Sequence, residues 1–230
     1  TVMGRLIAEA SGVAFTPQTG WAPDSIVYGS MALGALNSEG VGWTARPQWD
    51  DAKALWADFA QDGRLDAGAS EPSAPGRTWN GALSGAMRLE PGETRHVTFV
   101  LAWHFPNRAR DNHYGWGFGY PEALQYDFRL GNRYNTRFRD AAEVAAYAVR
   151  NLDRLEGDTR LFHDTFYNST LPRWLLDGVT ANIANIRSPI FVWLEDGTFA
   201  GFEGADACCP MNCTHVYNYA MSTAYLWPEL

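Results

Sequence analysis

A glutamate beside a glycine is the clearest candidate for a catalytic group in this sequence. Glu203 stands in the tripeptide Phe202-Glu203-Gly204, directly after a predicted pair of strands. A glycine next to a carboxylate lets a ligand approach the backbone closely, because it adds no side chain. A lone Glu-Gly pair more often belongs to a solvent-exposed turn. The interpretation of Glu203 as a catalytic group therefore needs support from elsewhere in the chain.

Two nearby carboxylates compete with Glu203. Glu195 and Asp196 precede Gly197, and the geometry of a hairpin turn already explains an Asp-Gly pair. Glycoside hydrolysis usually needs two carboxyl groups, about 5–5.5 Å apart in retaining enzymes and roughly 6.5–9.5 Å apart in inverting enzymes. Asp206 is too close to Glu203 in the sequence to be assumed to face it across a sugar. The residues therefore offer no convincing second carboxyl group.

A cluster of thiols follows Glu203. Cys208, Cys209 and Cys213 could bind zinc together with His215, but a structural zinc site usually takes four ligands in two separated pairs. Free thiols buried near a pocket are the favoured interpretation, and a strained disulfide between Cys208 and Cys209 is the least favoured. We therefore predict no metal and no cofactor.

Histidines and aromatic residues supply the remaining candidates. His104 ends an apolar run before a proline, where packing is the simpler role. His113 lies in an aromatic loop that could line a sugar pocket or pack on a partner. The chain has ten Trp and ten Tyr residues, and flat rings stack on the C–H faces of sugars. No phosphate-binding glycine loop, G-x-S-x-G elbow or nicotinamide fingerprint is present.

The composition narrows the class of protein. With 230 residues and 46% hydrophobic content, the chain can bury a sizeable core and is not expected to be disordered. A net charge of −8 argues against a nucleic-acid partner. No apolar run is long enough for a transmembrane segment, and the first residues lead into no signal peptide. The clustered cysteines leave the compartment undecided, with the cytoplasm favoured.

The first part of the chain predicts mainly β-structure, because short apolar or alternating runs are separated by turn-forming residues. The clearest strand covers residues 96–103 (HVTFVLAW) and follows a Pro-Gly turn at 90–93. Weaker strands are expected at 5–10 and 25–33, and one helix at 49–61.

The second part predicts mainly helices, because apolar residues recur there at three- and four-residue steps. Thr170 is the expected N-cap of one helix, with Pro172 in its first turn. A short strand hairpin is expected about Asp196-Gly197. The expected helices cover residues 140–155, 158–167, 171–186 and 214–226.

Several of these segments, taken in order, resemble glycoside hydrolase family 116, which includes the non-lysosomal glucosylceramidases and bacterial β-glucosidases. Residues 99–107 (FVLAWHFPN) are similar to the family's last sandwich strand, and residues 131–148 (GNRYNTRFRDAAEVAAYA) to the crossing into linker helices. Residues 170–186 (TLPRWLLDGVTANIANI) are similar to the first helix of the catalytic domain. The nucleophile segment of the family resembles residues 192–204 (VWLEDGTFAGFEG) and 213–230 (CTHVYNYAMSTAYLWPEL).

The resemblance implies an α+β multidomain protein, in which a β-sandwich portion is followed by the first helices of an (α/α)6 barrel. The implied boundaries are 1–132 for the C-terminal portion of the N-terminal β-sandwich domain, 133–169 for linker helices and 170–230 for the start of the catalytic domain.

The resemblance also implies retaining hydrolysis of β-glucosides, glucosylceramide-like or other, through a covalent glycosyl-enzyme. Glu203 matches the family's nucleophile. Thr214 and His215 would bind sugar hydroxyls, and Trp193 would offer a stacking face. His215 takes the place of an aspartate in the family's Tyr-Asp-Val-His pattern, which changes how the hydroxyls would be contacted.

The family's acid/base aspartate is expected beyond Leu230, and the chain has too few helices to complete such a barrel. We therefore expect an internal fragment that is inactive alone and would pack against the remainder of its chain. The main alternative is a non-catalytic carbohydrate-binding or docking module. A zinc-stabilised interaction domain is the third interpretation.

Overall fold

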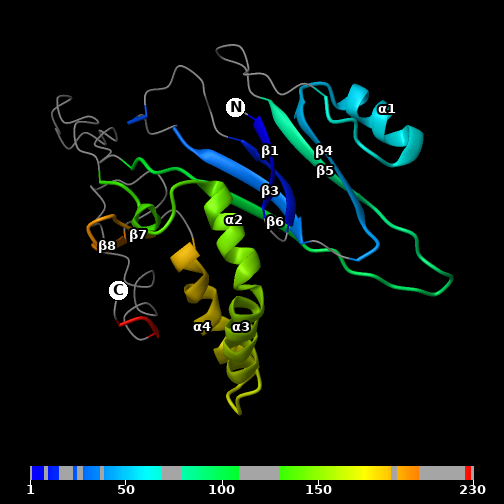
Figure 1. Cartoon of the computed structure of the whole chain (residues 1–230). Coiled ribbons are helices and arrows are strands. Elements are labelled where there is room, and N and C mark those ends of the chain that lie inside the picture. The colour runs from blue at the N-terminus through cyan, green and yellow to red at the C-terminus, as the bar shows by residue number, and fades with distance from the viewer. Residues whose placement is uncertain are drawn as a thin grey trace. The chain divides into compact units, whose positions relative to one another are not determined.

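The structure is a computed structural model of the whole chain, in which the described residues form a mixed α and β structure. They contain small antiparallel sheets and four α-helices (Figure 1). The chain divides into two compact units, Thr1–Phe105 with Phe138–Leu155 and Pro106–Arg137 with Glu156–Leu230. The described residues are 2–7, 10–15, 23–24, 28–36, 39–68, 79–108, 130–187, 191–201 and 226–228.

The larger sheet of the first unit is antiparallel and has four strands. Its strands lie in the order β1-β2-β3-β6. Within it, Ser30 lies opposite His104 and Ala32 lies opposite Ala102, so these residues share one face of neighbouring strands. The strand bounds are β1 (Val2–Ile7), β2 (Ala10–Phe15), β3 (Ser30–Leu36) and β6 (Phe99–His104).

The helix α2 (Ala141–Arg150) packs on this sheet, chiefly against β3 and β6. The contact is built from small side chains, which allow the helix backbone to come close to the strands. The backbone N–H of Ala141 donates to the Ser30 hydroxyl at 2.9 Å, and both residues are buried. The buried core residues at this contact are Ala32, Ala102, Ala141 and Ala145.

A second sheet in the same unit pairs β4 (Gly42–Trp49) with β5 (Asn80–Ala86), and it lies near β1, β2 and β3. Its register shifts between Arg46 and Trp49, where Pro47 has no N–H to donate to a ladder. Trp43 of β4 meets Phe99 of β6 edge-on, with 5.7 Å between ring centroids.

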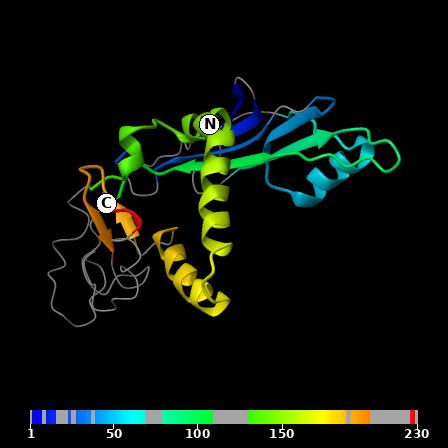
Figure 2. The same cartoon turned by 90° about the horizontal axis from the view of Figure 1, so that it is seen from below.

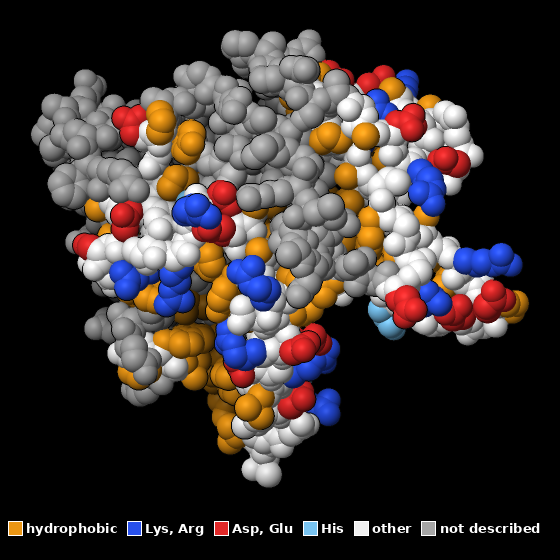
Figure 3. Space-filling model, viewed as in Figure 1, with side chains coloured by type: hydrophobic (Ala, Val, Ile, Leu, Met, Phe, Trp, Pro, Cys, Tyr) orange, Lys and Arg blue, Asp and Glu red, His pale blue; other side chains and the backbone are white. Residues whose placement is uncertain are grey.

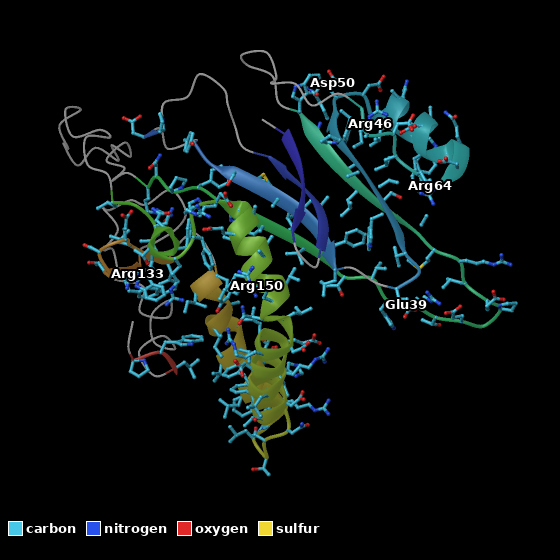
Figure 4. All side chains as sticks on the ribbon, in the orientation of Figure 1. Glu39, Arg46, Asp50, Arg64, Arg133 and Arg150 are labelled. Atoms are coloured by element: carbon cyan, nitrogen blue, oxygen red, sulfur yellow. The ribbon has the colours of Figure 1, made fainter. Side chains whose placement is uncertain are left out.

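Between β4 and β5 in the sequence, the chain forms α1 (Ala52–Asp62). The Asp51 carboxylate caps its first turn by accepting from the Lys53 N–H at 2.8 Å. Gly63 ends the helix with a left-handed φ of 75°. Arg46 of β4 points toward α1 and forms an ion pair of 3.2 Å with Asp58 (Figure 4).

The second unit contains most of α3 (Leu152–Tyr167), the whole of α4 (Arg173–Ile183) and a 3-10 turn at Ala184–Arg187. The Tyr167 hydroxyl donates to the hydroxyl of Thr180 on α4 at 3.1 Å. Hydrophobic side chains gather on the surface of both helices (Figure 3). The exposed ones on the two helices are Leu161, Phe162, Tyr167, Trp174, Leu175 and Val179, and Leu171 is exposed between the helices.

The second unit also holds a short hairpin, β7 (Phe191–Trp193) with β8 (Phe199–Gly201). It lies beside a 3-10 helix, Arg133–Thr136, as both ribbon views show (Figure 2). An isolated bridge between Asn132 and Leu194 joins the two segments.

Several sequence predictions are confirmed with shifted bounds. The strand predicted at 96–103 is β6, the helix predicted at 49–61 is α1, and the hairpin about Asp196-Gly197 is present. The turn at 90–93 is also present, with Gly92 at a φ of 80°.

Other predicted bounds are wrong. Residues 5–10 include the end of β1 and the first residue of β2, because these two strands pair with each other in an antiparallel arrangement. The helix predicted over 140–155 is interrupted at Asn151, where α2 ends. The helix α4 begins after Pro172, whose carbonyl accepts from Leu175 and Leu176. Thr170 is therefore not the N-cap, because the first carbonyl that accepts from the helix is that of Pro172.

Three further predictions remain untested by the fold. The β-sandwich, the start of an (α/α)6 barrel and the boundaries 1–132, 133–169 and 170–230 stay predictions. Of the last predicted helix, only Leu226 lies among the described residues. In the described part of the chain, none of the helices has the length and apolar character needed to cross a bilayer.

Candidate active site

The predicted site residues divide between the described and the undescribed parts of the chain. Glu203, Thr214 and His215 lie outside the described residues, as do His113 and the three cysteines. Trp193 lies in β7, and the competing carboxylates Glu195 and Asp196 lie in the turn of the β7–β8 hairpin. This hairpin is therefore the described structure closest in sequence to Glu203.

The hairpin turn explains Asp196. Its Oδ1 accepts a hydrogen bond from the Thr198 N–H at 2.8 Å, and Gly197 adopts a φ of 98°. This bond to the Thr198 backbone is the main reason that the pKa of Asp196 lies below its ordinary value. The Asp196 carboxylate therefore stabilises the turn, as the Asp-Gly pattern predicts.

Glu195 has a different environment. The side-chain amide of Asn135 donates to its Oε2 at 3.0 Å and also donates to the Pro106 carbonyl at 2.7 Å. Both neighbours are acceptors, so the nitrogen of the Asn135 amide must face them. The Glu195 carboxylate is thus half-buried and tied to a segment far away in the sequence.

Two more residues of that segment lie close to Glu195. The guanidinium of Arg133 donates to the Glu195 backbone carbonyl at 3.0 Å. Gly131 lies so close that an added Cβ would meet Glu195 Oε2 at 2.1 Å and Glu195 Cβ at 3.1 Å. We call Gly131, Arg133, Asn135 and Glu195 the Glu195 clamp. It holds the hairpin turn from the side chain and from the backbone.

Trp193 presents a ring beside this clamp. The residue is 39% exposed, and its Nε1–H donates to the Gly197 carbonyl at 3.2 Å. The Arg133 guanidinium carbon lies 5.6 Å from the ring centroid, which is the geometry of a cation–π contact. Arg133 therefore covers part of the Trp193 ring, while another part of the ring remains accessible.

Hydrogen bonds between further polar side chains hold the segment that carries the clamp residues. Arg108 Nε donates to Asn132 Oδ1 at 3.3 Å, and the Asn132 amide donates to the Tyr134 hydroxyl at 2.9 Å. Burial lowers the pKa of the Arg108 guanidinium from its ordinary value, because desolvation disfavours the charged form. The segment facing the hairpin therefore carries a partly buried positive charge.

Two buried polar atoms in the clamp, Arg133 Nε and Asn135 Oδ1, have no hydrogen-bond partner among the described residues. A buried donor and a buried acceptor that lack partners each carry a desolvation cost of about 1–3 kcal/mol. Both sit in the same 3-10 helix. The cluster is therefore polar beyond what its own hydrogen bonds satisfy.

His104 has a structural place in the first unit. It is 4% exposed, and its Nε2 lies 2.9 Å from the Phe138 carbonyl oxygen. This burial agrees with the expectation that His104 has a packing role and not a catalytic one. Among the described residues, no group of three or more His, Cys, Asp or Glu side chains could hold a metal ion.

The sequence reasoning missed Gly131, Arg133 and Asn135 as neighbours of the hairpin. They lie about sixty residues before Glu195, and no spacing rule connects positions so far apart. The available signal was the polar run Gly131-Asn132-Arg133-Tyr134-Asn135, which is too rich in hydrogen-bonding groups for a simple linker.

Comparison with known families adds the remaining finding. The N-terminal domain of glycosyl-hydrolase family 116, described as that of beta-glucosidase 2, matches residues 6–155. This match spans the described strands β2 to β6, the helix α2 and more than half of the chain. The resemblance in the sequence rested mainly on the second half, so the match extends it to the first. The chain belongs to glycosyl-hydrolase family 116.

Proposed function

We propose that this chain supplies the nucleophile of a retaining β-glycosidase, with Glu203 in that role. The observation that carries the proposal is the match to glycosyl-hydrolase family 116 over residues 6–155. The tripeptide Phe202-Glu203-Gly204 supports it, because it directly follows the last residue of β8. Membership of a glycoside hydrolase family makes a carbohydrate the substrate class, and a β-glucoside, glucosylceramide-like or other, is the proposed substrate.

In this mechanism the carboxylate of Glu203 attacks the anomeric carbon of the β-glucoside. The bond from that carbon to the leaving oxygen breaks, and a general acid protonates the leaving oxygen. Water then attacks the glycosyl-enzyme and releases the sugar with its configuration retained. The proposal assigns no general acid within residues 1–230, so we do not expect this polypeptide alone to turn over unactivated glucosides.

Three further residues are proposed to bind the sugar. Thr214 and His215 would contact hydroxyl groups, as the family pattern implies. Trp193 would stack on a C–H face of the ring, and its 39% exposure supports this role. Because Arg133 takes one approach to the Trp193 ring, the sugar would use the remaining accessible part.

The test is covalent trapping. The chain is incubated with a 2-fluoro β-glucoside that carries an activated leaving group, which needs little help from an acid. Intact-mass measurement should show one added glycosyl group, and peptide mapping should place it on Glu203. Glu203→Gln should abolish the adduct, whereas Asp196→Asn, a matched change in the nearby turn, should retain it.

The second candidate is a non-catalytic carbohydrate-binding module, which the exposed ring of Trp193 favours. A binding module should tolerate Glu203→Gln without loss of affinity for the glucoside and should never form an adduct. Absence of the adduct in the wild-type chain, together with glucoside binding that Trp193→Ala abolishes, would replace the glycosidase proposal with this one.

A further inference from the structure

The last described residue of the hairpin, Gly201, precedes Glu203 by two positions. Each residue spans no more than about 3.8 Å between Cα atoms, so the position of the β8 end limits where Glu203 can lie. Whatever holds the hairpin in place therefore bears on the proposed nucleophile. The β7–β8 pairing alone is short, since it joins only three residues on each side.

A three-residue hairpin needs outside support, because an isolated two-stranded hairpin is marginal in water. The Glu195 clamp provides such support. Asn135 holds the Glu195 carboxylate at 3.0 Å and Arg133 holds the Glu195 carbonyl at 3.0 Å. The bridge from Asn132 to Leu194 adds a backbone link on the same side.

The clamp is also sterically specific. Gly131 adopts a φ of 66°, and because it has no Cβ it leaves room for the Glu195 side chain. An added Cβ would lie 2.1 Å from Glu195 Oε2. The other end of the clamp is tied down as well, because Asn135 also donates to the Pro106 carbonyl at 2.7 Å. Glu195 therefore joins the hairpin to a segment that is itself held by further hydrogen bonds.

We propose that Glu195 is a positioning residue, whose carboxylate, held by Asn135 against the backbone of Gly131, fixes the β7–β8 hairpin and through it the place of Glu203. The proposal rests on the proposed function of Glu203. It assigns Glu195 no contact with the sugar and no proton transfer. The carboxylate acts through its hydrogen bond, so a neutral side chain with the same acceptor should replace it.

Three variants separate this role from others. Glu195→Gln keeps an acceptor for the Asn135 amide, and Glu195→Ala removes it. Glu156→Ala is the matched control, because it removes a glutamate that pairs with Arg160 on the surface of α3 in the same unit. All three are compared with the wild-type chain by circular dichroism, so that a variant that fails to fold is recognised.

The first readout is hydrogen exchange measured by mass spectrometry over residues 199–204. Glu195→Ala should raise the exchange rate of this peptide about tenfold, because the opening of the hairpin loses its side-chain anchor. Glu195→Gln and Glu156→Ala should exchange like the wild type. Unchanged exchange in Glu195→Ala would overturn the proposal, and so would equally fast exchange in Glu195→Gln.

The second readout is the maximal rate of covalent labelling at Glu203 by the activated 2-fluoro β-glucoside. Glu195→Ala should lower that rate about tenfold, and Glu195→Gln should restore it, as expected for a group that orients another. An unlabelled wild-type chain would count against the function proposed for Glu203, whereas the exchange rates would still decide whether Glu195 fixes the hairpin.

If folding of Glu195→Ala is impaired, Asn135→Ala tests the same bond from the other side. Its effect on exchange over residues 199–204 should match that of Glu195→Ala, and the double variant should exchange no faster than either single variant. Additive effects of the two changes would contradict a shared hydrogen bond and overturn the proposal.

Discussion

Asn135 and Glu195 lie 60 positions apart in the sequence and are joined by a hydrogen bond of 3.0 Å between the side-chain amide and the carboxylate. This bond changes the interpretation of Glu195. In the sequence it competes with Glu203 as a catalytic carboxylate, whereas in the structure it is a half-buried anchor of the hairpin turn. A carboxylate held in this way is poorly suited to attack a sugar.

The close approach of Gly131 to Glu195 predicts a large effect of a single methyl group. Gly131→Ala must place a Cβ at a positive φ and 2.1 Å from Glu195 Oε2. Gly63→Ala is the matched control, since Gly63 has a φ of 75° and no atom within 4 Å of its added Cβ.

Both changes should cost about 1–2 kcal/mol for the left-handed backbone alone. Gly131→Ala should cost clearly more, because Glu195 must also move. The free energies of unfolding from urea denaturation check this prediction. Equal losses in the two variants would show that Glu195 is easily displaced.

The contact between α2 and the sheet predicts that larger side chains are not tolerated there. Ala145 is 1% exposed and lies in the core with Ala32 and Ala102. Ala145→Leu should therefore lower the free energy of unfolding by about 1–3 kcal/mol through overpacking. Ala57→Leu on the exposed side of α1 is the control and should change it by no more than about 0.5 kcal/mol. Chemical denaturation of both variants provides the comparison.

The buried bond of His104 predicts one tautomer and one stability loss. A carbonyl oxygen only accepts, so Nε2 must carry the proton in its contact with Phe138. Nitrogen NMR of the imidazole should show a proton on Nε2.

Removal of that side chain should also be costly. His104→Ala should lower the free energy of unfolding by about 1–3 kcal/mol, since the Phe138 carbonyl loses its donor. His163→Ala, at a largely exposed position on α3, should have little effect in the same measurement. A similar loss in both variants would argue against a special role for the buried bond.

The ion pair at the start of α2 predicts a dependence on pH. Arg139 donates to the Glu143 carboxylate from its side chain at 2.6 Å and from its backbone at 2.7 Å. These bonds, the side-chain one first, lower the pKa of Glu143 below its ordinary value of 4.5. The stabilisation is therefore present above pH 4.5 and is lost as the pH falls through the lowered pKa.

Titration of the Glu143 carboxyl carbon by NMR measures this directly. Arg139→Gln should move the pKa of Glu143 up toward 4.5, whereas Arg160→Gln on α3 should leave it unchanged. A Glu143 pKa that stays low without Arg139 would assign the shift to another group.

The sequence alone determined the elements whose signals are local. A short apolar run indicated β6, the Asp-Gly pair indicated the β7–β8 turn, and the three- and four-residue apolar period indicated α2. Each signal depends on residues within one turn or one strand, so it survives without knowledge of the rest of the fold. The ordered segments that resemble family 116 are also a property of the sequence, and the match over residues 6–155 confirms that family.

Element bounds were less predictable, for a physical reason. The apolar period continues across Asn151, so the pattern does not show where α2 ends and α3 begins. The β1–β2 hairpin depends on cross-strand pairing with β3, which the strand sequences do not encode individually. Pattern and propensity therefore located the elements and left their ends to tertiary contacts.

Only the tertiary structure decided what surrounds the hairpin before Glu203. Gly131, Arg133 and Asn135 reach Glu195 because the chain returns after some sixty residues, and no local pattern records that meeting. A hydrogen bond between distant residues depends on where the backbone places both partners. For this reason the sequence could name Glu195 as a carboxylate with possible chemistry, whereas its neighbours in space made it an anchor.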